Sequence, residues 1–394
     1  MPVNSAPLGE LTPEQLDGGP AWLTDRRRTA LSFFQHSERP LWKRTDLSKL
    51  PLATLVPARG TVSLAYGELP AGVIVSTLAE ALQANELLVR RSLGTVVDSL
   101  THSFTALGAA LADDGVFIYI PKDTSVELPI HATFGIPAVG TVCGLHSLVV
   151  LERGASATFI EDYAGDDLAG TALVLATTEL LLGDGASLKY VPVQRWGRGV
   201  VHIGSQRALV GRDASLDWAA IGLGGSQQHI DAETALSGDG SRVDWVAATI
   251  GHERQQLLTA PWLRHIGANT EGHMDFKTVV KDAAYTTFDG MIKIEKTSRG
   301  TISRLEEHAL HLSPKARSDS IPGLMIDTND VAKAGHASTS GEVDDEQLFY
   351  MRSRGIDRTA AVNMIVMGFF EPILDRVPSE ALREALTDAI AARI

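Results

Sequence analysis

One short phrase returns five times in the middle of the chain: Asp123-Thr124-Ser125-Val126, Gly154-Ala155-Ser156-Ala157, Gly185-Ala186-Ser187-Leu188, Asp213-Ala214-Ser215-Leu216 and Gly240-Ser241-Arg242-Val243. Each copy begins as a tight turn of small or acidic residues and continues into β-branched, aromatic or leucine residues. Its third position falls at residues 125, 156, 187, 215 and 242, so the steps are 31, 31, 28 and 27 residues. A near-constant step in this range is typical of stacked supersecondary units.

The residues between the repeated phrases show patterns typical of strands. Leu145 to Leu151 and Ala172 to Leu182 are strand-like, and Val116 to Ile120 places apolar side chains at alternate positions. One turn of a coil cannot bury its inner face alone, so it needs neighbouring turns above and below. Gly and Asp supply the special backbone conformations at the corners. We therefore expect a mainly β protein with a β-solenoid core, in preference to an antiparallel sandwich with a hairpin about every 8–12 residues.

Composition excludes several classes of protein. The chain has 394 residues and a net charge of −13, which argues against a nucleic acid or an anionic membrane as the main partner. Cys143 is the only cysteine, so an intrachain disulfide and a cysteine metal site are not expected, and a reducing compartment suits the chain. We expect no secretory signal, because the N-terminus lacks a basic start followed by an apolar run. We expect no membrane span, because no apolar run reaches about 18 residues.

Sequence patterns typical of helices precede the predicted solenoid. We expect disorder at residues 1–10 and a helix from about Pro20 to Gln35, in which Arg26-Arg27-Arg28 forms a solvated face. Further helices are predicted within residues 78–87 and 101–112, where apolar residues recur at helical spacing.

Capping signals mark helices after the solenoid. Asp344-Asp345-Glu346 should begin a short helix that ends before Gly355. Asp357 should cap a second helix, which runs to about Glu371, and Ser379 should begin a third. Such helices can cover the open strand edges at the end of a solenoid. The chain is thus divided into an N-terminal helical and mixed region, 1–110, a solenoid core, 111–335, and a C-terminal helical region, 336–394.

Few sequence patterns indicate a catalytic or metal-binding site. His308 and His311 would share one face of a helix, but their segment resembles a strand, which points them to opposite faces. We interpret the acidic cluster at Glu161, Asp162, Asp166 and Asp167 as a solvated turn, because it lacks EF-hand spacing. Three further histidines show no ligand spacing and are assigned to polar loops: His252, His265 and His273. No phosphate-binding loop motif is present, so we do not expect the chain to hydrolyse nucleotide.

His336 is the strongest candidate. It is the one aromatic side chain in a predicted loop of small residues, 330–341, where the solenoid gives way to helices. Small neighbours leave the imidazole accessible, and a neutral imidazole is a common metal ligand. The alternative from the residues alone is a histidine that caps or hydrogen-bonds locally.

The C-terminal text resembles the SufB/SufD family of iron–sulfur cluster assembly proteins. The resemblance rests on Gly335 to Gly341 (GHASTSG), on Asp344 to Ile356 (DDEQLFYMRSRGI), on Phe288 to Ile294 and on Trp42 to Leu47. Ser353 to Ile356 and the glycine after the histidine segment resemble the SufD branch of the family more than the SufB branch.

The resemblance implies a right-handed parallel β-helix between helical regions, in a cytoplasmic complex with SufB and the ATPase SufC. It implies that SufB pairs with the β-helix and that SufC binds the C-terminal helices, for which the candidate residues are Phe349, Tyr350, Arg352, Arg354, Met364 and Phe369. His336 matches a family histidine implicated in cluster assembly at the SufB–SufD interface, where iron or a cluster would be held transiently and no cofactor stably. Ala334 stands where some SufD proteins have a cysteine, so thiolate ligands would come from SufB. Cys143 matches no family motif, and we expect it to be buried.

We therefore expect a non-enzymatic scaffold subunit. One alternative is a homodimeric, SufB-like protein that assembles clusters alone, although an assembly cysteine near the C-terminus is missing. The isolated chain is also a plausible homodimer. Another alternative is a β-helical enzyme acting on polysaccharide, which would usually show clustered acids along a groove.

Overall fold

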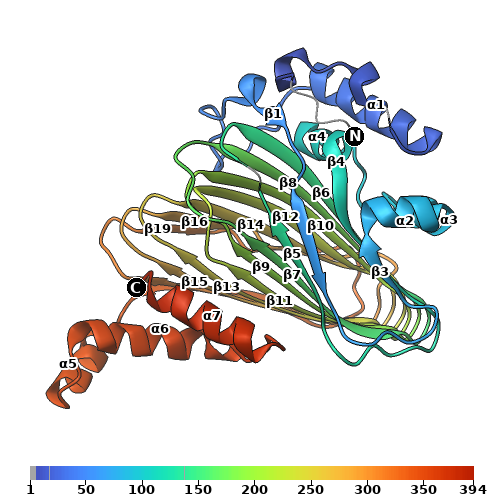
Figure 1. The fold of residues 1–394 in the computed structure, drawn as a ribbon. Coiled ribbons are helices and arrows are strands. Elements are labelled where there is room, and N and C mark those ends of the chain that lie inside the picture. The colour runs from blue at the N-terminus through green and yellow to red at the C-terminus, as the bar shows by residue number, and fades with distance from the viewer. Residues whose placement is uncertain (1–5, 17, 137) are drawn as a thin grey trace.

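Two parallel sheets face each other across one core in the computed structural model, which describes residues 6–16, 18–136 and 138–394 (Figure 1). Within these residues, the first sheet (sheet A) has 12 strands and the second (sheet B) has nine. The chain alternates between the sheets, and each strand pairs with the strand one turn earlier and one turn later. For example, β6 (Thr141–Leu151) pairs with β4 (Ala112–Ile120) and β8 (Ala172–Leu182). This is a β-solenoid, as the repeated phrase predicted.

Sheet A runs in the order β19-β16-β14-β12-β10-β8-β6-β4-β3, with β1, β17 and β20 beside this path. Its strands are β1 (Val56–Pro57), β3 (Ile74–Thr77), β4 (Ala112–Ile120), β6 (Thr141–Leu151), β8 (Ala172–Leu182), β10 (Val200–Val210), β12 (Gln227–Leu236), β14 (Gln256–His265), β16 (Tyr285–Phe288), β17 (Met291–Ile294), β19 (Arg317–Ser320) and β20 (Gly323–Ile326).

Sheet B runs in the order β2-β5-β7-β9-β11-β13-β15-β18-β21. Its strands are β2 (Thr61–Ala65), β5 (Ile130–Gly135), β7 (Ser156–Ala164), β9 (Ser187–Arg195), β11 (Ser215–Gly222), β13 (Arg242–Gly251), β15 (Glu271–Val280), β18 (Thr301–His311) and β21 (Val331–Glu342). In the described part of the chain, antiparallel pairing is confined to β2–β5 and β3–β4 at the N-terminal end. The hairpin sandwich is therefore excluded.

The corner chemistry read from the sequence is confirmed. The first residue of every repeated phrase has a positive φ, between 53° and 69°: Asp123, Gly154, Gly185, Asp213 and Gly240. Asn269 and Gly300 continue this column with φ values of 53° and 65°. Backbone hydrogen bonds join successive corners, such as Gly154 N–H to the Asp184 carbonyl at 2.8 Å. Each corner is thus stacked on the corresponding corner of the previous turn.

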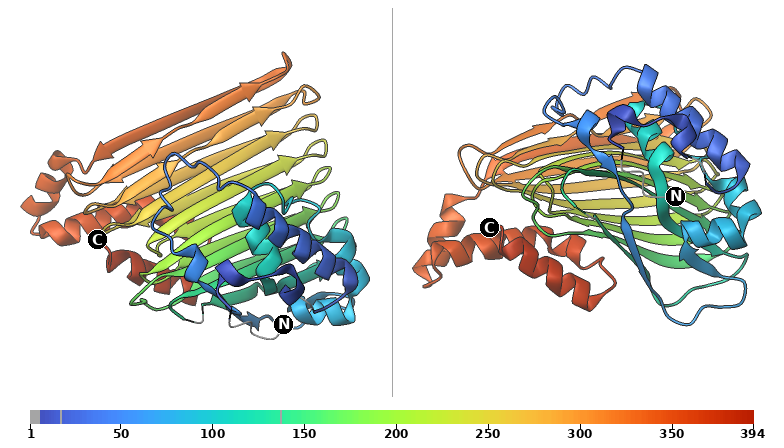
Figure 2. Two further views of the ribbon diagram at one scale, coloured as in Figure 1. Left: turned by 90° about the horizontal axis from the view of Figure 1, so that it is seen from above. Right: turned by 45° about the horizontal axis from the view of Figure 1, so that its top comes forward.

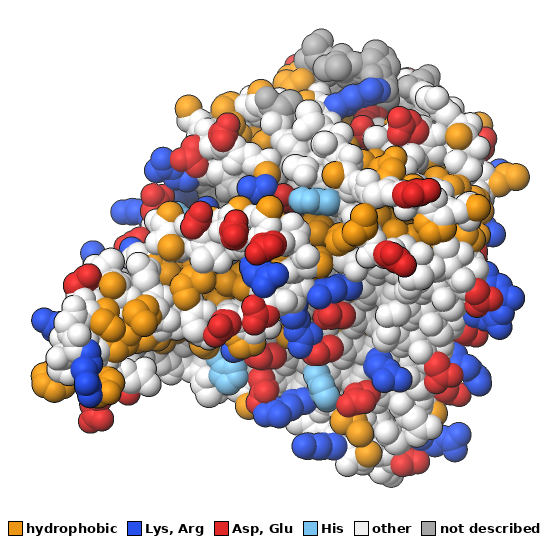
Figure 3. Space-filling model, turned by 60° about the horizontal axis from the view of Figure 1, so that its bottom comes forward, with side chains coloured by type: hydrophobic (Ala, Val, Ile, Leu, Met, Phe, Trp, Pro, Cys, Tyr) orange, Lys and Arg blue, Asp and Glu red, His pale blue; other side chains and the backbone are white. Residues whose placement is uncertain are grey.

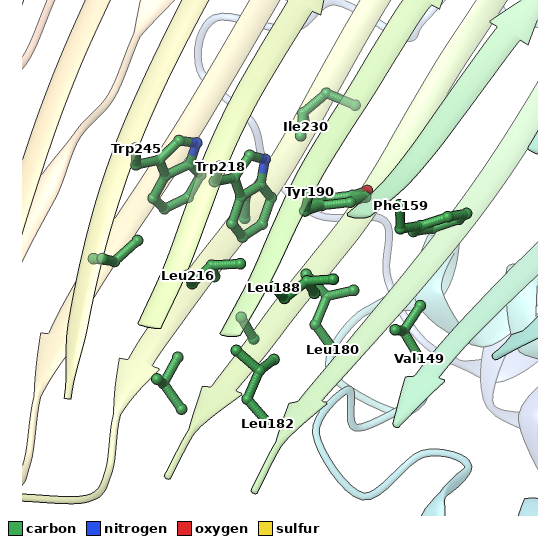
Figure 4. Packing of buried hydrophobic residues seen from close by; sticks show 14 of the residues in the cluster. Val149, Phe159, Leu180, Leu182, Leu188, Tyr190, Leu216, Trp218, Ile230 and Trp245 are labelled. Atoms are coloured by element: carbon green, nitrogen blue, oxygen red, sulfur yellow. The ribbon is translucent and has the colours of Figure 1, made fainter. Parts of the chain in front are cut away.

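Aromatic side chains fill the middle of the core (Figure 4). Phe159, Tyr190, Trp218 and Trp245 occupy matching positions on four consecutive strands of sheet B. The rings of Trp218 and Trp245 stack with centroids 4.2 Å apart. Because the strands are in register, like side chains lie directly above one another, and each ring covers the ring below it.

The N-terminal helices cover the outer face of sheet A, where apolar residues of α1 and α4 pack on β6, β8 and β10 (Figure 1). The elements are η1 (Leu8–Glu10), η2 (Pro13–Leu16), α1 (Ala21–His36), η3 (Leu52–Thr54), α2 (Leu78–Ala84), α3 (Glu86–Ser92) and α4 (Ser103–Leu111). The helix expected from Pro20 to Gln35 is confirmed as α1, and the helix expected within residues 101–112 as α4. The helix expected within 78–87 is instead two short helices, which meet at Asn85.

Two N-terminal predictions were wrong. Disorder was expected at residues 1–10, but Leu8 is buried in η1 against the helical region, while residues 1–5 lie outside the described residues. The face of Arg26 to Arg28 is not uniformly solvated, because Arg27 is buried. Its guanidinium donates to the Ala112 carbonyl and lies 3.5 Å from the Asp113 carboxylate.

The C-terminal helices cover the outer face of sheet B (Figure 2). They are α5 (Asp345–Ser353), α6 (Arg358–Leu374) and α7 (Glu380–Ala391). The predicted helix starts and the predicted cap at Asp357 are confirmed. Asp344 and Ser379 are also caps, and each of the three side chains accepts a backbone N–H of the helix that follows. Apolar residues of α6 and α7, such as Phe370 and Leu386, pack on β9, β11 and β13. α6 continues past the expected end at Glu371 and includes Pro372.

Three predictions about polar segments were also wrong. The small-residue loop at 330–341 is the strand β21, which continues across the boundary expected between residues 335 and 336. Glu161 and Asp162 are not in a solvated turn, because both are buried in β7. His265 and His273 lie on β14 and β15 rather than in loops. Alternation along a strand buries a side chain that composition alone would put in water.

Candidate functional site

The last turn of the solenoid leaves one strand edge open. β21 pairs with β18 on one side and is the final strand of sheet B within the described residues. Its outer edge therefore presents backbone N–H and C=O groups without a strand partner, which is a template for pairing with another chain. Most of β21 is exposed, and its side chains are small, from Ala332 to Gly341, apart from Lys333 and His336.

His336 is the last member of a column of inward-facing side chains in sheet B, which we call the inner column. Register places it opposite Leu305 of β18, and Leu305 opposite Met274 of β15. Met274 in turn pairs with Trp245, so the column of Phe159, Tyr190, Trp218 and Trp245 leads to this histidine. The imidazole is exposed because no further turn covers it. A position that holds an aromatic, methionine or leucine side chain in every turn from β7 to β18 thus holds a histidine at the open end.

A buried carboxyl lies behind this end. Glu307 of β18 is 1% exposed and pairs in register with Ser338. The Ser338 hydroxyl lies 3.0 Å from the Glu307 carboxylate and 2.8 Å from the Ser320 hydroxyl of β19. Burial raises the pKa of Glu307. The hydrogen bonds among Glu307, Ser338 and Ser320 thus link the two sheets at the last turn. We did not single it out from the sequence, although the alternation of Leu305, Glu307 and Ala309 is a signal that it faces inward.

The other histidines are separate from His336. His308 and His311 point to opposite faces of β18, as predicted, and they hydrogen-bond to Thr339 at 2.7 Å and Ser318 at 2.8 Å. Among the described residues, no group of three or more His, Cys, Asp or Glu side chains could hold a metal ion. Ala334 packs partly on the core. Cys143 is fully buried, as expected, and burial raises the pKa of its thiol to about 12.

The C-terminal helices present a second surface. Phe349 and Tyr350 on α5 are 74% and 60% exposed, and Met364 on α6 is 56% exposed. Hydrophobic side chains gather at this end of the molecule, at the left of Figure 3. Arg352 and Arg354 are exposed beside them, and the Arg354 guanidinium lies 5.2 Å from the Tyr350 ring centroid.

Phe369 differs from these candidates. It lies on α6 and is partly buried against the apolar cluster between the C-terminal helices and sheet B. The Lys277 ammonium lies 5.2 Å from the centroid of its ring. The open apolar surface of the C-terminal helices is therefore formed by α5 and by the neighbouring turn of α6, rather than by Phe369.

Sequence comparison matches these regions to known domains. Residues 136–369 match the SufBD core domain of the SUF system for iron–sulfur cluster assembly, and residues 61–132 match the N-terminal region of SufBD proteins. The chain belongs to the SufBD family. The core match covers the solenoid from β6 onward, His336 and most of α6.

Curated relatives support this SufBD assignment. The iron–sulfur cluster assembly protein SufD of Bacillus subtilis is 34% identical over 327 residues, which are 82% of this chain and 74% of that protein. SufBD family proteins of Staphylococcus saprophyticus and Staphylococcus aureus are 28% identical over 309 residues, 78% of this chain and 66% of each of theirs. In the described part of this SufBD protein, every helix is too short or too polar to span a membrane.

Proposed function

We propose that this SufBD protein is a non-catalytic scaffold subunit of the cluster assembly complex, of the SufD kind. In this proposal SufB stacks on the open end of the solenoid and the ATPase SufC docks on α5 and α6. The observation that carries it is the unpartnered edge of β21 together with the polar end of the inner column. The complex would work in the cytoplasm, which agrees with the single buried cysteine.

Stacking of a second solenoid explains the end of the core physically. A β-solenoid that ended in solution would expose apolar core, and polar residues at His336, Ser338 and Ser340 reduce this exposure. A partner strand along β21 would satisfy the free backbone groups of the edge. It would also enclose His336 between two chains. There the imidazole would contact iron or a nascent cluster, which is the cargo of the system, and SufB would supply the cysteine ligands.

The exposed aromatic residues of α5 suit a protein partner. Phe349, Tyr350 and the adjacent arginines are the residue types that are enriched at protein interfaces. Asp344 and Gly355 fix both ends of this short helix. A partner that changes shape with nucleotide could therefore pull on the solenoid end through α5 and α6.

Selective disruption tests the two surfaces. We expect Ser340→Arg to abolish co-purification of SufB from the native organism, because the arginine fills the open end of the core. Ala337→Arg, on the opposite face of the same strand, is the matched control and should retain SufB. We expect Phe349→Glu to abolish co-purification of SufC and to retain SufB. Retention of both partners by both variants would refute the proposal.

The role of His336 needs a separate readout. In a strain that depends on this pathway, His336→Ala should lower the activity of cluster-containing enzymes while the complex still assembles. Unchanged enzyme activity would assign His336 to capping of the solenoid end.

A self-sufficient homodimer is the second candidate, because the same open edge can pair with a copy of itself. Reconstitution of the purified chain with iron and sulfide distinguishes the two. A stable visible-absorbing cluster on this chain alone would favour the homodimeric scaffold over the SufB-dependent one.

A further inference from the structure

A small cavity lies inside the solenoid, between the two sheets. Its volume is about 50 Å³. Strands β10, β11, β12, β13 and β14 contribute its principal lining residues: His202, Trp218, Gln228, Trp245 and Thr259. One water needs roughly 10–15 Å³, so the space is large enough for water.

Three of the lining residues carry buried polar atoms without a hydrogen-bond partner. These atoms are both ring nitrogens of His202 and the indole nitrogens of Trp218 and Trp245. The three residues are 2%, 0% and 1% exposed. The indole nitrogens of Trp218 and Trp245 project in the same direction from their stacked rings (Figure 4). Buried polar atoms in folded proteins are nearly always hydrogen-bonded, to protein or to ordered water.

The chemistry of these atoms selects the occupant. Burial lowers the pKa of His202 to about 3, so its imidazole is neutral, with one nitrogen that donates and one that accepts. The indole N–H groups only donate. An occupant must therefore both accept and donate. A simple anion cannot donate and a metal cation cannot accept, whereas water does both.

We propose that this cavity is a permanent hydration site, in which ordered water binds Trp218, Trp245 and His202 as part of the solenoid core. The site extends a polar network of side chains. Gln206 also lines the cavity, and its amide donates to the Tyr190 hydroxyl at 3.3 Å. That hydroxyl donates to the buried Glu161 carboxylate, which also accepts from Thr178 at 3.0 Å. The cavity thus lies beside a network that leads to a buried acid, and His202 lines the same cavity.

The chain contains its own control residue. Trp22 does not line the cavity, and its indole N–H already donates to the Glu86 carboxylate at 2.9 Å. In the ¹⁵N-labelled protein, the indole signals of Trp22, Trp218 and Trp245 can be assigned by their loss in the corresponding Trp→Phe variants. We expect cross-peaks between long-lived water and the indole protons of Trp218 and Trp245, and none for Trp22. Absence of water cross-peaks for both Trp218 and Trp245 would overturn the proposal.

A crystal structure of the unchanged protein gives a second readout that needs no variant. Electron density for water at hydrogen-bond distance from the Trp218 and Trp245 nitrogens supports the site, and an empty cavity refutes it.

Discussion

At the scale of single residues, the solenoid depends on the backbone conformation of its corners. Gly185 shows this most cleanly, because its φ is +67° and no atom lies within 4 Å of the position that a Cβ would take. Gly185→Ala should therefore destabilise the protein through the backbone alone, by about 1–2 kcal/mol. Denaturant unfolding measures this. Gly185→Asn is the control and should cost less, since asparagine tolerates the left-handed region better. Equal stability of Gly185→Ala and the unchanged protein would contradict the argument.

At the scale of elements, one buried carboxylate anchors the N-terminal region to sheet A. Glu179 of β8 accepts the backbone N–H groups of Gly94, Val96 and Val97, and it lies 2.8 Å from the ring of His146. Burial opposes ionisation, but these hydrogen bonds hold the pKa of Glu179 below its ordinary value. The segment after α3 thus depends on a charge supplied by a strand.

Glu179→Gln should destabilise the protein by about 2–3 kcal/mol, because hydrogen bonds to a charged group are lost. It should also speed amide hydrogen exchange at Gly94, Val96 and Val97. The matched control is Glu152→Gln, which removes an exposed ion pair with Arg91 and should cost less than about 1 kcal/mol. Unchanged exchange at the three amides would show that the anchor is elsewhere.

At the scale of the whole molecule, buried histidines set the response to acid. Burial lowers the pKa of His202 to about 3, and of His229 and His265 to about 4. In the unfolded chain these groups have their ordinary pKa of 6.5, so the unfolded state binds more protons below that pH. Their contribution to stability is complete above about pH 6.5 and declines as the pH falls toward 4.

We therefore expect the free energy of unfolding to decrease between pH 6.5 and about pH 4.5, by up to about 1.4 kcal/mol per pH unit for each histidine. Denaturant titrations across this range measure the slope. His265→Gln removes one of these groups, so its slope should be shallower, whatever its stability at pH 7. An identical slope would mean that other groups govern the acid response.

The sequence by itself determined the solenoid and the residues at which the helices near the C-terminus begin. The reason is that both depend on local chemistry. A corner needs a residue that accepts a positive φ, and Asp213 and Gly240 meet this need without reference to distant parts of the chain. Asp357 caps α6 through a contact three residues away. His336 stays a candidate that rests on its small neighbours and its match to a family motif, and its segment is a strand rather than the predicted loop.

Only the tertiary structure decided which polar residues face the core. Glu161 and Glu307 look like solvent-exposed acids in the sequence, but strand register turns both inward. The end position of His336 depends on the register of β7 through β21, which no local pattern records. The internal cavity arises from side chains of both sheets, such as His202 and Trp218. Contacts of this kind depend on how the turns stack, since residues far apart in the sequence meet only when the coil is complete.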